Sequence, residues 1–173
     1  VPTVTATDNC DATLLVVLYS ETISVTDGVG SITREWTVTD VGGNTTTETQ
    51  TITVIDSTPP VLVGLPVDIF VQCDAIPGIP VVTATDNCDT TLTVGFFELD
   101  LVIDGVGAIY RQWTVTDDGG NTTADTQIIL VIDTTHPVLV GVPGNVTVEC
   151  NAILPIDETV TATDNCDTTL PVT

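Results

Sequence analysis

The chain has no lysine and no methionine, and only Arg34, Arg111 and His136 carry basic side chains. Because 24 residues are acidic, the formal net charge is −22. Binding to nucleic acid phosphates or to anionic lipid headgroups depends on Lys and Arg, so this charge excludes both partners. It is typical of a soluble surface, of cation binding or of repulsion between fibres. No apolar run approaches the roughly 20 residues of a membrane span, so we expect no membrane insertion in this segment.

Catalytic residue sets are also lacking. His136 is the only histidine, and the preceding copy of its TTHP sequence has Pro59 at the same place. A catalytic base or a zinc ligand is not expected to alternate with Pro, so His136 is predicted to be an exposed linker residue. The chain has no Ser-His-acid set, no His pair and no CxxC spacing. The sequence therefore predicts a protein that is not an enzyme.

What the chain does have is repetition. The heptapeptide TATDNCD occupies residues 5–11, 83–89 and 161–167, at steps of 78 residues. Residues 36–73 and 113–150 are identical at 25 of 38 positions without gaps. Such a period indicates an array of small domains. We predict a partial repeat at 1–57 without its first strands, a complete repeat at 58–135, and the N-terminal strands of another at 136–173.

Each repeat shows the period-two alternation of β-strands. In residues 109–117, Arg111 and Trp113 share the apolar face, and Tyr110 lies on the other. Expected strands are residues 61–65, 69–73, 81–85, 92–99, 109–117 and 125–132. Six or seven short strands in about 78 residues leave no room for crossover helices, so we predict all-β, tandem immunoglobulin-like antiparallel β-sandwich repeats. Trp36 and Trp113 are predicted core aromatics, and Arg34 and Arg111 are expected to pair with an acid over them.

The order of motifs resembles a known family. PVLVGLP is followed by VQC, VTATDNC, YRQWTVTDDGGN and TQIILVIDTT. This order is similar to the hyalin-repeat (HYR-like) immunoglobulin-type domains, which occur in tandem in large secreted or surface proteins, including adhesins of gliding bacteria. The resemblance covers the whole chain and implies an extracellular β-sandwich scaffold, with no catalytic residue.

Cysteine spacing predicts disulfides. Cys73 and Cys88 are 15 residues apart, Cys150 and Cys166 are 16 apart, and Cys10 is left for an upstream cysteine. We favour these pairs within repeats, which places the protein outside the cytosol. The alternative joins neighbouring repeats by pairing Cys10 with Cys73 and Cys88 with Cys150.

Acidic turns make calcium the candidate ligand, since it binds carboxylate, amide and carbonyl oxygens. The candidate donors are Asp56, Asp86, Asp89, Asp117, Asp118 and Asp133, and turn formation is the simpler interpretation of each. Candidate glycosylation residues are the sequon residues Asn44, Asn121 and Asn145, and the Ser or Thr that follows Asp in DST and DTT: Ser57, Thr90, Thr134 and Thr168.

We therefore predict a structural or adhesive protein of the cell surface or extracellular space that forms a fibre, stalk or filament. Its partners would be neighbouring copies or repeats of itself, or surface glycans or proteins. Linkers with Pro59 or Pro137 are expected to keep successive domains extended. The alternative is a carbohydrate- or protein-binding module of a larger secreted enzyme, with Tyr19, Phe96, Phe97 and Tyr110 as the available aromatics. Ice binding by Thr-x-Thr strands is a third alternative.

Overall fold

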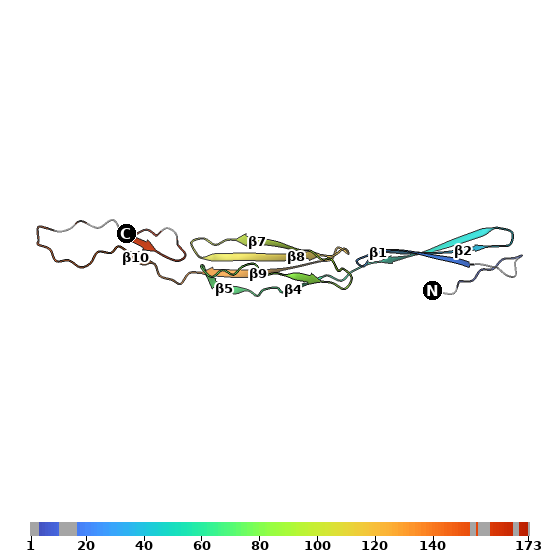
Figure 1. Ribbon diagram of the computed structural model, residues 1–173, viewed down its shortest axis with the longest axis horizontal. Helices are drawn as coiled ribbons and strands as arrows, with labels where there is room; N and C mark the ends of the chain where they lie inside the picture. Colours follow the sequence, from blue (N-terminus) through green and yellow to red (C-terminus); the bar gives the residue numbers. More distant parts are fainter. Residues whose placement is uncertain (1–3, 11–16, 153–154, 156–159, 168–169, 173) are drawn as a thin grey trace. The chain divides into compact units, whose positions relative to one another are not determined.

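The computed structural model describes residues 4–10, 17–152, 155, 160–167 and 170–172. Over this part of the chain it is all-β and contains no helix, so none is available to cross a membrane (Figure 1). The strands are β1 (Val17–Thr26), β2 (Val29–Thr39), β3 (Thr45–Val54), β4 (Val61–Val63), β5 (Ile69–Gln72), β6 (Thr83–Thr85), β7 (Val94–Asp100), β8 (Gly107–Thr116), β9 (Thr122–Ile132), β10 (Val138–Val140) and β11 (Thr161–Thr163).

Contacts divide the chain into two compact units. Unit 1 consists of Val1–Val63, Thr83–Val94 and Val115–Thr123, and unit 2 consists of Gly64–Val82, Gly95–Thr114 and Ala124–Thr173. Each unit contains one of the two acidic clusters described below, so each cluster is positioned by its own unit.

The described strands pair in four sheets. One sheet is antiparallel and contains β1, β2 and β3. A second consists of β4 and β6, and a third consists of β10 and β11. In both short ladders a VLV strand is antiparallel to a TAT strand, with Val61 opposite Thr85 and Val138 opposite Thr163. The TAT of the second and third TATDNCD motifs, at 83–85 and 161–163, is therefore held by hydrogen bonding to the strand that follows a linker, and this positions the acidic turn that comes next.

The fourth sheet has the order β5-β9-β8-β7, and in it β5 runs parallel to β9, with Ile69 opposite Ile129. The prediction of a purely antiparallel sandwich was therefore wrong at this strand. Gly64, with φ of 85°, turns the chain after β4, and β5 pairs with the edge of β9 rather than with β6. Period-two alternation identifies which face a residue occupies but carries no information on strand direction.

The core of unit 2 lies between β5, β8 and β9. Ile109, Ile129 and Val131 are buried, and Ile69 and Val71 of β5 pack against them. The predicted alternation in β8 is confirmed, because Ile109, Arg111 and Trp113 are buried while Tyr110 and Gln112 are exposed. Burial on alternate positions is what places the Arg111 side chain inside the protein.

The two tryptophans differ in burial. Trp113 is buried as predicted and its ring centroid lies 5.3 Å from that of Phe96. Trp36 makes the equivalent contact with Tyr19 at 5.6 Å but is only half-buried. The prediction that it is a core aromatic is therefore confirmed for its ring contact and not for full burial. Residues 4–10 are the only described chain before β1 and form no strand, which leaves the Trp36 ring less covered.

Candidate functional site: two acidic clusters around cysteines

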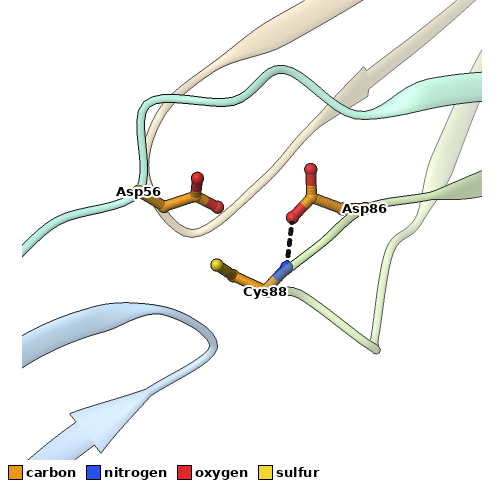
Figure 2. A group of neighbouring side chains, drawn as sticks. All are labelled: Asp56, Asp86 and Cys88. Atoms are coloured by element: carbon orange, nitrogen blue, oxygen red, sulfur yellow. Dashed lines mark hydrogen bonds between the residues drawn. The ribbon is translucent and has the colours of Figure 1, made fainter.

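The structure gathers acids around two cysteines. Asp56, Asp86 and Cys88 form one cluster in unit 1, in which one ligand atom of each residue lies within 4.8 Å of the others (Figure 2). Asp133, Asp164 and Cys166 form the equivalent cluster in unit 2. We call them the Asp56 cluster and the Asp133 cluster. Each combines the Asp of a VID sequence with the Asp and Cys of a TATDNCD motif, so the sequence repeat is also a repeat of chemistry.

Local turns fix one oxygen of each carboxylate in the Asp56 cluster. Asp86 Oδ1 accepts hydrogen bonds from the backbone N–H groups of Cys88, at 2.8 Å, and Asp89, at 3.1 Å. These two bonds lower the pKa of Asp86. Asp56 Oδ1 accepts from the N–H of Thr58 at 3.0 Å. The remaining oxygens, Oδ2 of both residues, have no hydrogen-bond partner among the described residues, although the Asp56 side chain is only 8% exposed.

The Asp133 cluster has the same construction. Asp164 Oδ1 accepts from the N–H of Cys166 at 2.9 Å, and Asp133 Oδ1 accepts from the N–H of Thr135 at 2.9 Å. Oδ2 of Asp164 and Oδ1 of Asp167 are buried without a partner in the described part of the chain. Burial, followed by the charges of Asp104, Asp164 and Asp133, raises the pKa of Asp167. Several carboxylates thus share a site that offers them few donors.

A disulfide joins Cys73 to Cys166 across 93 residues of sequence. The predicted pairs Cys73–Cys88 and Cys150–Cys166 were therefore wrong, and the alternative with Cys10 bonded to Cys73 was wrong too. The parallel pairing of β5 explains the difference: Gln72 lies opposite Ile132, which brings the next residue, Cys73, level with Asp133 and its cluster. Cys88 belongs to the other cluster. Cys10, Cys88 and Cys150 are not disulfide-bonded in the structure.

Two glycines that the sequence argument missed make the clusters possible. Asp27 and Gly28 form the turn between β1 and β2, both with positive φ, and Asp104 and Gly105 repeat it. A Cβ on Gly28 would lie 2.4 Å from Cβ of Cys88, and one on Gly105 would lie 2.3 Å from Cβ of Cys166. Each turn therefore approaches a cysteine as closely as only glycine permits. The DGVG sequence, present in both repeats, was the available signal.

No basic side chain of the described residues neutralises these clusters. Lysine is absent, and Arg34 and Arg111 are paired elsewhere, with Glu21 at 2.7 Å and with Glu98 at 2.6 Å. The prediction that each Arg pairs with an acid is confirmed. His136 is exposed, as predicted. The carboxylates can therefore be neutralised only by protons or by cations from solution.

The other predicted calcium ligands are engaged in turns. Asp117 accepts from the Asn121 N–H at 2.7 Å and from Asn121 Nδ2 at 2.9 Å, which uses both carboxylate oxygens. Asp89 accepts from Thr91 N–H at 2.8 Å through Oδ1 and from Asp118 N–H at 3.3 Å through Oδ2. Asp118 is exposed. Of the six candidates, only Asp56 and Asp86 belong to one cluster of possible metal ligands among the described residues, and Asp133 lies in the second cluster.

The candidate glycosylation residues differ in accessibility. Ser57, Thr90, Thr134, Asn44 and Asn145 are exposed, whereas Asn121 is half-buried. Asn121 Nδ2 donates to Asp117 and, at 3.3 Å, to the carbonyl of Asp56. A glycan on that nitrogen would remove one of these donors, so Asn121 is the least suited of the set. Thr168 lies outside the described residues.

No protein-family model matches the chain, and the curated proteins contain no match to it. The resemblance to hyalin repeats therefore rests on the quoted motifs, and the function has to be argued from the clusters and the disulfide.

The free thiol of Cys88 provides a test of the cluster geometry. Burial and the charges of Asp56 and Asp86 raise the pKa of Cys88, which disfavours the reactive thiolate. We expect iodoacetamide to modify Cys88 at pH 8 several-fold more slowly than the exposed Cys10 and Cys150, as measured by mass spectrometry of peptides. Asp56→Asn should accelerate modification of Cys88 alone, whereas equal rates in both proteins would contradict the cluster.

Proposed function

We propose that this chain is part of a structural or adhesive extracellular protein, in which tandem immunoglobulin-like repeats form a fibre, stalk or surface filament. The observation that carries the proposal is the Cys73–Cys166 disulfide. Cys73 belongs to the predicted repeat 58–135 and Cys166 to the predicted repeat 136–173. In the structure both cysteines lie in unit 2, so the bond closes 93 residues within one compact unit and prevents that length from extending, which is useful in a protein that carries tension.

The disulfide also supports the proposed location. Structural disulfides persist in oxidising compartments and are rare in the cytosol. Repeats of about 78 residues bury little surface for their size and depend on such cross-links for stability. Exposed Thr on β3 and the high negative charge fit a surface in contact with water and cations rather than with nucleic acid.

Antibodies against the chain test this function directly. We expect them to label fibres or the surface of intact source cells in immunoelectron microscopy, and labelling that appears only after permeabilisation would contradict the proposal.

In single-molecule pulling, reduction of Cys73–Cys166 should lengthen the extended chain by about 300 Å, because it releases 93 residues at about 3.3–3.6 Å each. The Cys10→Ala variant is the matched control, since Cys10 is not disulfide-bonded.

The rival function, carbohydrate binding, has weaker support. Sugar sites need exposed aromatic faces, but Tyr19 contacts Trp36 and Phe96 contacts Trp113. Phe97 and Tyr110, at 60% and 37% exposure, are the other two candidates. Tyr19 and Phe96 are themselves 40% and 42% exposed, so all four aromatics reach the surface, but two of them also contact a tryptophan ring.

Cation binding is a second candidate function, favoured by the partnerless carboxylate oxygens. Asp56 and Asp86 direct their side chains toward a common space (Figure 2), and each has an oxygen that accepts from no donor of the described residues. Calcium prefers carboxylate oxygens and completes its shell with carbonyls and water. We infer that the Asp56 and Asp133 clusters each bind one Ca²⁺, which would offset the repulsion between their acids.

Calcium titration of the folded chain tests this inference. In 150 mM NaCl, calorimetry should show two sites, and Asp56→Asn or Asp133→Asn should each remove one. A concentration 100 times the Kd should stabilise each unit, which holds one site, by about 2.7 kcal/mol. Asp118→Asn is the control because Asp118 is exposed and its N–H, not its carboxylate, makes the observed contact. A melting curve that is unchanged in excess chelator would show that bound Ca²⁺ does not stabilise the chain.

A further inference from the structure

The four-stranded sheet of β5, β9, β8 and β7 has one face in the core and one face toward solvent. Burial alternates along β8 and β9, which directs Tyr110 and Leu130 away from the core. Phe70 of β5 lies opposite Leu130 in the ladder, so it belongs to the same outer face, and it is 73% exposed. These strands all belong to the repeat 58–135.

β7 contributes to the same outer face. Glu98 bonds the buried Arg111 on the core side, so its neighbours Phe97 and Leu99 point the other way. Leu101 continues this alternation, and its N–H donates to the Ala108 carbonyl at 3.0 Å. Apolar side chains that are at least 37% exposed on this face are Phe70, Phe97, Leu99, Leu101, Tyr110, Leu130 and Ile132. We call them the outer patch.

The preceding repeat has hydroxyl residues where the outer patch is apolar. The counterparts of Phe97, Leu99, Leu101, Tyr110 and Leu130, 77 residues earlier, are Ser20, Thr22, Ser24, Thr33 and Thr53. The core side does not change in this way, because Arg111 and Trp113 correspond to Arg34 and Trp36. The same strands therefore form with a Ser and Thr surface, and the fold does not require an apolar outer patch.

The outer patch is large enough for a protein interface. Its side chains are about half exposed, and at roughly 150–200 Å² for each they present on the order of 600 Å². Two such patches would bury roughly 1,200 Å², which is above the about 1,000 Å² expected of a specific interface. A contiguous apolar surface of this size marks an interaction site, unlike single exposed residues.

Charge indicates which partner fits. The outward positions of β7, β8 and β9 hold Gly, Ala, Thr, Gln, Tyr, Phe, Leu or Ile and none of the 24 acids. Asp68, just before β5, already accepts from the Ile128 N–H at 2.7 Å. A basic partner would therefore find no carboxylate within the patch, and a sugar would find few polar groups between the aromatics. An identical apolar patch can be buried against it without desolvating a charge.

We propose that the outer patch of one copy of this chain packs against the outer patch of a second copy, face to face about a two-fold axis. Sheets pack in this way in β-sandwiches, about 10 Å apart. Tyr110 and Leu130, on the middle strands, would lie at the centre, and Phe70 and Phe97, on the outer strands, at the rim. The inference rests on the proposed fibre or filament and names the face through which chains associate.

Net charge gives the pairing a characteristic salt dependence. Each copy has a formal charge of −22, so two copies repel before their patches meet. Salt shortens the range of this repulsion from about 10 Å at 0.1 M to about 3 Å at 1 M. Pairing of two copies should therefore strengthen as NaCl rises, whereas binding of a basic partner would weaken.

Sedimentation velocity of the 173-residue chain, from about 1 to about 200 µM, tests the proposal. We expect a reversible monomer–dimer equilibrium whose dissociation constant is several-fold lower in about 500 mM NaCl than in about 150 mM. Non-reducing gels of the same samples should show monomer only, because the pairing is not covalent.

A matched pair of double variants locates the interface. Leu99→Thr with Leu130→Thr restores the residues of the preceding repeat and should raise the dissociation constant at least tenfold. Thr favours strands and both positions are exposed, so the fold should be retained. Val138→Thr with Val140→Thr, at valines of β10 that are 61% and 47% exposed, should change it less than twofold.

A single charge tests the centre of the outer face. Gln112→Glu introduces the residue that the preceding repeat has at this place, Glu35. Two copies would then bring like charges together, so we expect a dissociation constant several-fold higher in about 150 mM NaCl and a smaller difference in about 500 mM. A loss that is equal at both salt concentrations would place Gln112 outside the interface.

The outcomes separate the pairing from the proposed function. A chain that stays monomeric in both salts, a dimer that survives Leu99→Thr with Leu130→Thr, or a monomer that binds oligosaccharides through the patch would each overturn the pairing. Surface labelling of source cells by antibody judges the function independently. Labelled fibres with a monomer in solution would count against the pairing alone, and dimers of a protein found only inside cells would count against the function alone.

Discussion

Replacing Cys73 with Ala is expected to lower the free energy of unfolding of unit 2 by about 4–5 kcal/mol. The bond closes a loop of 93 residues, and the chain-entropy model gives this magnitude for a loop of that size. Cys73 also packs against the Ile109–Ile129–Val131 core, so its loss removes apolar contact as well. Urea unfolding followed by Trp113 fluorescence, in a Trp36→Phe background, measures the change.

Two controls make the disulfide result specific. Cys166→Ala should destabilise by a similar amount, since either change opens the same loop, and the double variant should add little. Cys10→Ala should leave the unfolding midpoint unchanged, because Cys10 is exposed and unbonded. Overlapping curves for Cys73→Ala and the parent protein would show that the 93-residue connection carries no stability.

Arg111→Met is expected to destabilise unit 2 by about 3 kcal/mol. Arg111 is 4% exposed, its Nε donates to Glu98 at 2.6 Å, and its Nη2 donates to the Pro77 carbonyl at 2.9 Å. Removing one member of a buried pair leaves the other charge without compensation. The estimate is at the lower end of the usual range because the Glu98 side chain is 33% exposed and water can solvate it.

Arg34→Met is the matched comparison, because it occupies the same place in the other repeat. Its side chain is 25% exposed and that of Glu21 is 29% exposed, so water replaces the lost ion pair more readily. We expect a clearly smaller change than for Arg111, measured by urea unfolding of unit 1 followed by Trp36 fluorescence in a Trp113→Phe background. Equal losses at both positions would show that burial does not set the strength of this pair.

Sequence periodicity predicted the positions of strands well because side-chain alternation follows directly from strand geometry. All six expected strands coincide with observed ones to within a few residues, and the buried face of β8 carries Arg111 and Trp113 as predicted. The pairing of each Arg with an acid also followed from composition, since two basic residues among 24 acids have many partners available. Strand direction and sheet order did not follow, because alternation is the same in parallel and antiparallel strands.

The residue pattern alone identifies an acidic β-strand protein with a 78-residue period and cysteines in a repeated motif. Which cysteines meet depends instead on how the strands pair in three dimensions. Spacing favours the pair 15 residues apart, because short loops cost less entropy to close. The parallel addition of β5 to β9 instead carries Cys73 to Asp133 and Cys166. The grouping of the acids also depends on the three-dimensional structure. Asp56 and Asp86 converge from distant segments, whereas Asp117 closes its own turn with Asn121.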